Sequence, residues 1–189
     1  MDYFEDKSFK NINFKQTGFI KGEYEYCQFE QCNFESINID SCKFIDCTFF
    51  DCNLSLTSLI QASFQNIKFN NCKLLGIRFD SLNQFNLQLE FKECILNHSS
   101  FYACKIKGTN FSACKLLDVD FENTVLSNGS FVGSDLNGAH FINATLEKTD
   151  FRECQNLVLD PDLNNIKAAK FSLNNLPGLL VKYKIKISL

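Results

Sequence analysis

The feature that most constrains the fold is a large apolar residue at every fifth position. An α-helix repeats its buried face near 3.6 residues and a strand near 2, so a period of five fits neither. The backbone must turn a corner in every repeat, which indicates a solenoid of short β-segments. In the second half of the chain the series is Phe91, Leu96, Phe101, Ile106, Phe111, Leu116, Phe121, Leu126, Phe131, Leu136, Phe141, Leu146 and Phe151.

A second series lies two residues before the first and consists mostly of small side chains, such as Cys94, Ser99 and Thr109. Between Ser8 and Cys154, outside an irregular stretch near residues 80–90, neither series contains a charged residue. Burying an unpaired charge costs several kcal/mol, so a core must exclude such residues. Both series are therefore expected to point inward, and the remaining positions outward.

The repeat unit of small, polar, large apolar, polar and polar residues resembles the pentapeptide-repeat family, whose pattern is roughly Ala-Asp/Asn-Leu-x-x. The closest matches are Thr109-Asn110-Phe111, Ser134-Asp135-Leu136-Asn137-Gly138 and Thr149-Asp150-Phe151. The resemblance implies an all-β fold, a right-handed quadrilateral β-helix with about twenty residues per turn. We expect residues 1–155 to form this β-helix and residues 156–189 to form a small helical C-terminal cap.

The period is interrupted once, because Phe79 and Phe91 are two residues further apart than two repeats require. We interpret this as a two-residue insertion near residues 80–90, a bulge or short loop in which Phe85 or Leu87 fills the displaced side. If a turn contains four repeats, one side of the solenoid then consists only of phenylalanine: Phe9, Phe29, Phe49, Phe69, Phe91, Phe111, Phe131 and Phe151.

The 10 cysteines all fall in the small inward series, which favours a packing role for them. No Cys-x-x-Cys pair or neighbouring histidine suggests a metal site, and no Gly-rich loop suggests a phosphate or a cofactor. Unpaired thiols are typical of a reducing cytoplasm. We expect no signal peptide and no membrane-spanning segment. His98 and His140 fall on outward positions without an evident catalytic partner, so we expect no enzyme unless a cleft joins one of them to a carboxylate.

The C-terminal segment departs from the period after Cys154. Pro161 could begin a short helix, residues 173–183 could form a second one, and residues 184–188 alternate like a strand. Such an end resembles the dimerising tails of gyrase-directed family members, while a monomeric lid over the last turn is the alternative. The candidate dimer contacts are Leu176, Leu179, Leu180, Tyr183, Ile185 and Ile187.

The formal net charge of −3 argues against a general nucleic-acid binder, which usually carries a basic stripe. Acidic residues are enriched in the first third, basic ones in the middle, and acidic ones return near the end. That last group is the candidate partner-contact surface: Glu122, Asp135, Glu147, Asp150 and Glu153. Outward charge could instead serve only to keep a rod soluble.

The uninterrupted rod and the Leu-Pro-Gly-Leu-Leu tail look most like the branch that contains the microcin-immunity protein McbG and the Qnr quinolone-resistance proteins. This resemblance implies a DNA mimic that binds DNA gyrase, or topoisomerase IV, and protects it from a poison. Several Qnr proteins project long loops needed for protection, whereas here the insertion is short. The alternative function is a scaffold or interaction module with an unrelated protein partner.

Overall fold

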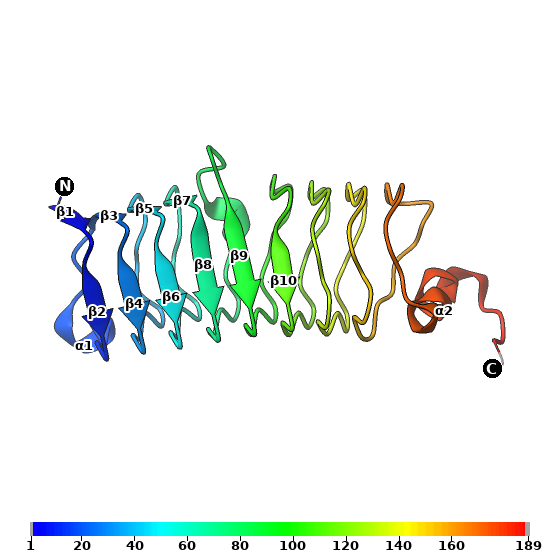
Figure 1. Ribbon diagram of the computed structural model, residues 1–189, viewed down its shortest axis with the longest axis horizontal. Helices are drawn as coiled ribbons and strands as arrows, with labels where there is room; N and C mark the ends of the chain where they lie inside the picture. The colour runs from blue at the N-terminus through cyan, green and yellow to red at the C-terminus, as the bar shows by residue number, and fades with distance from the viewer. Residues whose placement is uncertain (1, 188–189) are drawn as a thin grey trace.

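A computed structural model describes residues 2–187 of the chain. The chain winds along one axis as an elongated rod, with its two termini at opposite ends (Figure 1). The strands and helical segments, with η for 3-10 helix, are β1 (Asp2–Glu5), β2 (Ser8–Lys10), α1 (Phe14–Thr17), β3 (Gly22–Glu25), β4 (Gln28–Glu30), β5 (Lys43–Ile45), β6 (Thr48–Phe50), β7 (Ser63–Gln65), β8 (Ile67–Asn70), η1 (Phe79–Ser81), β9 (Leu89–Lys92), β10 (Asn110–Ser112), η2 (Leu173–Asn175), α2 (Leu176–Leu179) and η3 (Val181–Tyr183).

The strand pairs are parallel and join successive coils of the rod. One sheet has the order β1-β3-β5-β7 and the other β10-β9-β8-β6-β4-β2, so each strand pairs with the equivalent strand of the next coil. Beyond β10 the ladders continue as isolated parallel bridges such as Lys105 to Val125. This arrangement confirms the predicted solenoid, a parallel β-helix in which backbone hydrogen bonds run along the rod.

The predicted insertion is a loop between β8 and β9 that projects from the rod (Figure 1). Before the loop, Ser63 bridges to Asn83, and at the loop Ile67 pairs with Leu89, which adds two residues to the coil. Of the two candidate fillers, Leu87 is 6% exposed and occupies the core, whereas Phe85 is 70% exposed at the surface. The loop therefore keeps the core continuous with the smaller side chain and presents the larger one outward.

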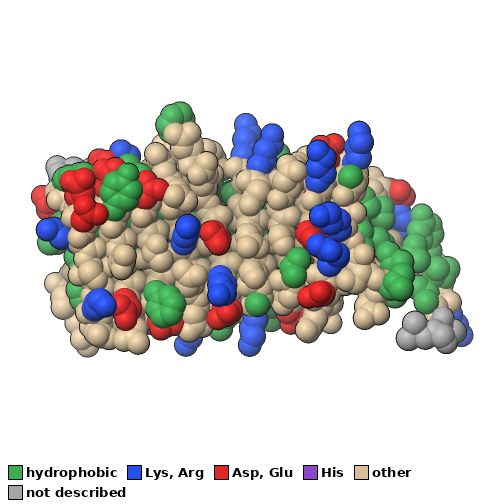
Figure 2. Space-filling view, in the orientation of Figure 1, with side chains coloured by type: hydrophobic (Ala, Val, Ile, Leu, Met, Phe, Trp, Pro, Cys, Tyr) green, Lys and Arg blue, Asp and Glu red, His purple; other side chains and the backbone are tan. Residues whose placement is uncertain are grey.

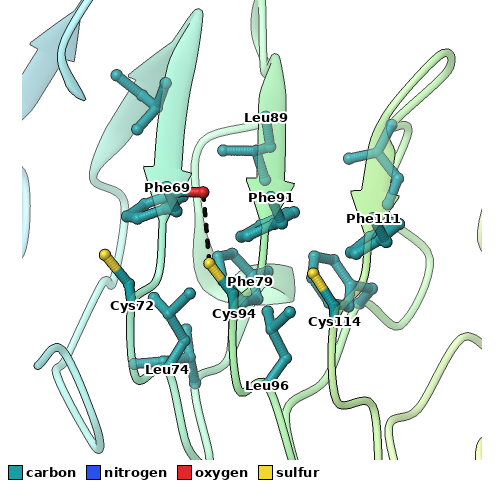
Figure 3. Packing of buried hydrophobic residues seen from close by; sticks show 14 of the residues in the cluster. Phe69, Cys72, Leu74, Phe79, Leu89, Phe91, Cys94, Leu96, Phe111 and Cys114 are labelled. Carbon is teal, nitrogen blue, oxygen red and sulfur yellow. Dashed lines mark hydrogen bonds between the residues drawn. The ribbon is translucent and has the colours of Figure 1, made fainter. Parts of the chain in front are cut away.

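The predicted phenylalanine column is present along one side of the core. Neighbouring rings in successive coils stack with centroids 4.8 to 5.3 Å apart. Figure 3 shows part of this column, with Phe69, Phe91 and Phe111 in line. The column extends one coil beyond the expected Phe151, because Phe171 stacks on it at 5.3 Å.

The small inward column provides hydrogen bonds as well as volume. The Cys94 thiol donates to the carbonyl oxygen of Phe69 in the previous coil at 3.3 Å (Figure 3), and Thr124 donates to Phe101 in the same way at 2.8 Å. All ten cysteines are free and buried, which confirms their predicted packing role. Burial raises the pKa of Cys47 and of Cys104 to about 12, so these thiols stay protonated at neutral pH.

The corners explain why Asn, Asp and Gly follow the large inward residues. Two positions after such a residue the backbone commonly has a positive φ, as at Asn71 (51°), Asn123 (58°) and Gly133 (73°). Glycine adopts this conformation without a steric cost, and Asn and Asp tolerate it better than other residues. The polar half of the repeat is therefore set by the turn geometry.

A helical turn, α1, stands where the period predicts an ordinary corner after Phe14. Asn13 caps it, because its side-chain oxygen accepts a hydrogen bond from the Lys15 backbone N–H at 3.2 Å. Phe14 still points inward, with its ring centroid 4.6 Å from that of Phe34. The turn therefore enlarges one corner and leaves the core column intact.

The coils continue past the expected boundary at residue 155. Bridges join Thr145 to Asn165 and Asp150 to Lys170, so the last coil reaches to about Phe171. The helix expected to begin at Pro161 is absent: the chain turns there and rejoins the ladder at Asn165. Ile166 and Phe171 resume the inward series after an irregular side, and their packing against the previous coil outweighs the local helix signal.

The tail after the last coil forms the predicted helical cap in short pieces, η2, α2 and η3. Residues 184–187 adopt no strand, contrary to the expectation for 184–188, and Ser188 lies outside the described residues. A strand at this position would need a neighbouring edge to pair with.

Candidate partner-binding surfaces

The five predicted acidic contact residues lie on different sides of the rod. Asp135 belongs to the ladder of Lys115 and Gln155, and Asp150 to the ladder of Ser130 and Lys170. The other three stand at corners. Glu122 directly follows Phe121, Glu147 directly follows Leu146, and Glu153 lies two residues after Phe151. The structure therefore does not bring the group together on one wall.

Most of these carboxylates are held by side chains of the rod itself. Asp135 accepts a hydrogen bond from the Asn156 amide at 2.7 Å, and Glu147 one from Asn165 at 3.0 Å. The Arg152 guanidinium donates a hydrogen bond to the Asp150 carboxylate at 2.7 Å, and this bond holds the pKa of Asp150 below its usual value. The charges consequently have defined positions.

Side-chain hydrogen bonds also fix the positions of acidic residues in the first third of the chain. Asp46 accepts from the side chain of Asn66 and Asp51 from that of Asn71, each one coil further along. Burial raises the pKa of Asp40, but hydrogen bonds from Ser58 and other donors lower it by more, so the pKa lies below its ordinary value. The lowered pKa keeps the Asp40 carboxylate ionised at neutral pH, and the hydrogen bonds from Asn66 and Asn71 fix the positions of Asp46 and Asp51.

The predicted dimer contacts form part of an apolar surface at the C-terminal end, visible as a green cluster in Figure 2. Leu179 packs against the core, and Leu180 is half-buried beside it. We call the exposed remainder the C-terminal apolar patch, which consists of Leu173, Leu176, Val181, Tyr183, Ile185 and Ile187. Contiguous exposed apolar side chains of this kind are typical of a protein-binding surface.

Two residues outside the predicted set anchor this tail. The side chain of Asn175 donates to the carbonyl of Cys154 at 2.8 Å and also accepts the N–H of Ser172 at 3.1 Å. Lys182 pairs with Asp160 at 2.6 Å and also with Asp162. The spacing Ser172-x-x-Asn175 resembles a capping box and could have indicated the first of these contacts.

The histidines form no catalytic group in the described structure. The Nδ1 atom of His98 lies 3.6 Å from Asp118 one coil away, a partner that the sequence did not suggest. The His98 side chain is 61% exposed, and His140 is exposed in the ladder of Asp120. Residues 2–187 contain no group of three or more potential metal ligands, and none of their helices has the length and apolarity needed to cross a bilayer.

A shallow groove of about 670 Å³ follows the outside of the cysteine column. Its walls mix polar and apolar side chains, and the charged lining residues are Asp51, Lys73, Glu93 and Lys115. The charges along it alternate in sign, and its floor includes the buried Cys72. The groove offers no concentration of one charge or of apolar surface that would define a small-molecule ligand.

Comparison with solved structures supports the fold. Two structures of trypsin-treated variants of QnrB1, described as a plasmid-mediated fluoroquinolone resistance protein, are similar to this chain. One variant matches with a TM-score of 0.60 at 18% identity, over 99% of this chain and 92% of that one. The other variant matches with a TM-score of 0.52 at 16% identity, over 99% of this chain and 100% of that one. No curated protein sequence matches significantly.

The model of the pentapeptide repeat region matches residues 22–90 and 84–151, which is most of the chain. The matched ranges meet at the loop between β8 and β9, where the structure adds two residues to one coil. The five-residue period, the inward columns and this match agree. The chain belongs to the pentapeptide-repeat family.

Proposed function

We propose that this chain is a non-enzymatic binding protein that mimics duplex DNA and occupies the DNA-binding groove of DNA gyrase or topoisomerase IV. Binding there would give immunity or resistance to a poison of the enzyme. The likeness to QnrB1, whose description names fluoroquinolone resistance, supports the proposal at the level of fold. The protein would act in the cytoplasm, where these enzymes work.

The main support for the proposal is the way carboxylates are fixed along the rod. Asp46, Asp51 and Glu147 each accept a hydrogen bond from an asparagine of a neighbouring coil. Because stacked coils lie about 4.8 Å apart and are joined by backbone hydrogen bonds, these side-chain bonds hold negative charges at fixed positions on a stiff rod. Duplex DNA presents its phosphates in a comparable way, as a rod with fixed negative charges.

Purified gyrase tests this function directly. We expect the protein to inhibit supercoiling in a concentration-dependent way, or to protect gyrase from a poison in the same assay. The double substitution Glu147→Lys and Asp150→Lys should weaken inhibition of gyrase. The charge-retaining double substitution Glu147→Asp and Asp150→Glu should preserve inhibition. If the protein neither inhibits gyrase nor protects it, the DNA-mimic function is wrong.

The scaffold alternative is favoured by the scattered acidic residues, because no single wall gathers Glu122, Asp135 and Asp150. A scaffold would bind a partner through one wall, independently of gyrase. Affinity purification from a gyrase-depleted extract separates the two functions. Recovery of a stoichiometric partner without gyrase inhibition would replace the DNA-mimic proposal.

We also propose that two copies join end to end through the C-terminal apolar patch. The 54% exposure of Val181 and 58% of Tyr183 leave large apolar side chains in water at the end of the rod. Sedimentation velocity at ~500 mM NaCl, where salt screens contacts between surface charges, should show a dimer. The double substitution Val181→Asp and Ile185→Asp should dissociate this dimer, whereas Phe50→Ser, at another exposed apolar site, should not. If the unsubstituted protein is a monomer, end-to-end dimerisation is wrong and the tail serves only to cover the last coil.

A further inference from the structure

One wall of the rod has the projecting loop at its midpoint. The ladder that defines this wall, which we call the loop wall, is traced by parallel bridges and by the 3.3 Å hydrogen bond from the Lys105 N–H to Gln84. Asn83, at the base of the loop, has equally many rungs on either side. The rungs in order are Tyr3, Glu23, Lys43, Ser63, Asn83, Lys105, Val125, Thr145 and Asn165.

The two halves of the loop wall carry opposite charges. In Figure 2, red side chains gather toward the N-terminal end and blue ones toward the C-terminal part of the upper edge. The lysines of the basic half are exposed, and the described residues give none of them an ion-pair partner. The acidic half contains Glu5, Asp6, Glu23, Glu25 and Asp46, together with Lys43, which pairs with Glu23 at 2.7 Å. The basic half contains Lys105, Lys107, Lys148 and Lys167, together with Glu147, so the net charges of the two halves are opposite.

At the centre of the loop wall, the projecting loop presents an apolar side chain. Phe85 at the tip of the loop is 70% exposed, although Leu87 in the same loop is buried. Beside the loop lies a hollow of about 320 Å³, lined by Ile45, Gln65 and Asn86 among others. The wall thus has a protruding aromatic side chain next to a recess, between an acidic and a basic half.

We propose that the loop wall binds a second copy of this chain, side by side and antiparallel. A two-fold axis near the loop places the acidic half of each copy against the basic half of the other, so one surface is complementary to itself. The two loops lie next to each other at the axis, each beside the hollow of its partner. This interface is separate from the C-terminal end and does not depend on the proposed function.

The arrangement follows the usual anatomy of a protein interface. An aromatic anchor lies in the middle, where water is excluded, and the charged side chains form the rim. A single exposed ion pair contributes little, but the two-fold axis makes every contact twice. Because the rim is charged and solvated, the association weakens as salt rises.

The first test is sedimentation equilibrium of the full chain at ~50 mM and ~500 mM NaCl, where screening differs strongly. To isolate this interface, the measurement uses the background Val181→Asp with Ile185→Asp. We expect a dimer at low salt whose dissociation constant rises at least about tenfold at high salt. A monomer at both salt concentrations, up to the solubility limit, overturns the proposal.

Charge reversal tests which surfaces meet. Lys107→Glu with Lys148→Glu should weaken the homodimer at least about tenfold, and so should Glu5→Lys with Glu25→Lys. An equimolar mixture of these two variants should form a heterodimer, because each then complements the other along the whole wall. Failure of the mixture to associate contradicts the antiparallel contact.

A matched control lies on the opposite side of the rod. Lys73 and Lys115 stand in one ladder, joined through Ile95, two sides away from the ladder of Lys105. Lys73→Glu with Lys115→Glu changes the net charge by the same amount and should leave the dimer unchanged. If it weakens the dimer equally, net charge and not the loop wall governs association.

Cross-linking tests the position of the axis. Asn86→Cys should give covalent dimers with a short bismaleimide, because the native cysteines are all buried. Ser36→Cys is the control. Asn86 (φ 53°) and Ser36 (φ 58°) are both exposed corner residues, but they lie on different sides of the rod. Cross-linking through residue 36 but not 86 would contradict the proposed axis.

Discussion

Phe111 and Phe131 lie one coil apart and stack with ring centroids 5.0 Å apart and planes 6° from parallel. The same two rings meet a second column edge-on, for example Phe111 against Phe121 at 83°. Stacked contacts along the rod and edge contacts across it are both favourable geometries for aromatic rings. The core is therefore ordered in two directions, and each coil depends on its neighbours.

Phe111→Asp should unfold or aggregate the protein, because it places an unpaired charge at a fully buried position. Phe111→Ala should lower the free energy of unfolding by about 3–5 kcal/mol through lost contacts and a cavity. Urea denaturation followed by circular dichroism measures both changes. Phe50→Ala, at a side chain that is 48% exposed, is the control and should cost about 0.5 kcal/mol or less.

The loop offers a pair of neighbouring substitutions with different outcomes. Leu87→Ala should lower the free energy of unfolding by about 2–3 kcal/mol, because Leu87 fills the core where the coil is enlarged. Phe85→Ser should change stability by about 0.5 kcal/mol or less, since Phe85 is exposed. Thermal unfolding of both variants provides the comparison, and an equal loss in both would contradict the assignment of Leu87 as the filler.

Gly178→Ala should detach the helical cap from the last coil. A β-carbon at this position would lie 1.8 Å from the carbonyl oxygen of Leu157, so α2 must move. Hydrogen exchange should show faster exchange in residues 172–183, with the coils before residue 150 unaffected. Leu173→Ala, at an 83% exposed site of the same tail, should leave exchange unchanged. Normal protection in the glycine variant would show that the cap does not pack as described.

The protein should lose stability at alkaline pH because its thiols are buried. Burial raises the pKa of Cys154 to about 11 and that of Cys47 to about 12, whereas an unfolded thiol titrates near 8.5. The unfolded state therefore releases protons first, and the contribution of the thiols is complete below about pH 8.5 and decreases as pH rises toward 11–12. Urea midpoints measured from pH 7 to 11 should fall.

A matched variant separates the thiols from other alkaline effects. Cys47→Ala with Cys154→Ala should be less stable at pH 7 yet show a shallower fall toward pH 11, because two of the titrating groups are gone. In the folded protein at pH 8, a thiol reagent should modify the cysteines only as fast as the rod opens. An unchanged slope in the variant would assign the pH dependence to other groups.

The parts of the fold that depend on the repeat were predictable, and those that depend on its interruptions were not. The alternation of large and small residues was enough to predict the inward columns, including Phe91 and Cys94. Between Gln155 and Asn164 the period fails, so the last coil with Ile166 and Phe171 was mistaken for a cap. Asn13 could have indicated a helical start, but nothing local shows that α1 replaces a corner.

The candidate surfaces were harder to predict than the core. The repeat placed Glu122, Asp135 and Asp150 outward, but their distribution around the rod depends on the register across the loop at Asn83. The opposite charges of the loop wall involve residues as distant as Glu5 and Lys167. They share a wall only after every coil between them has been counted correctly.

The order of residues along the chain is sufficient to specify the β-helix, because only a backbone that turns at every repeat can bury two series with a period of five. The roles of the cysteines and of the outward polar positions follow from the same pattern, through the exclusion of charge. Packing between coils, by contrast, determines that Leu87 and not Phe85 enters the core, and that the last coil ends near Phe171. These outcomes depend on contacts with a coil about twenty residues away, which no local pattern contains.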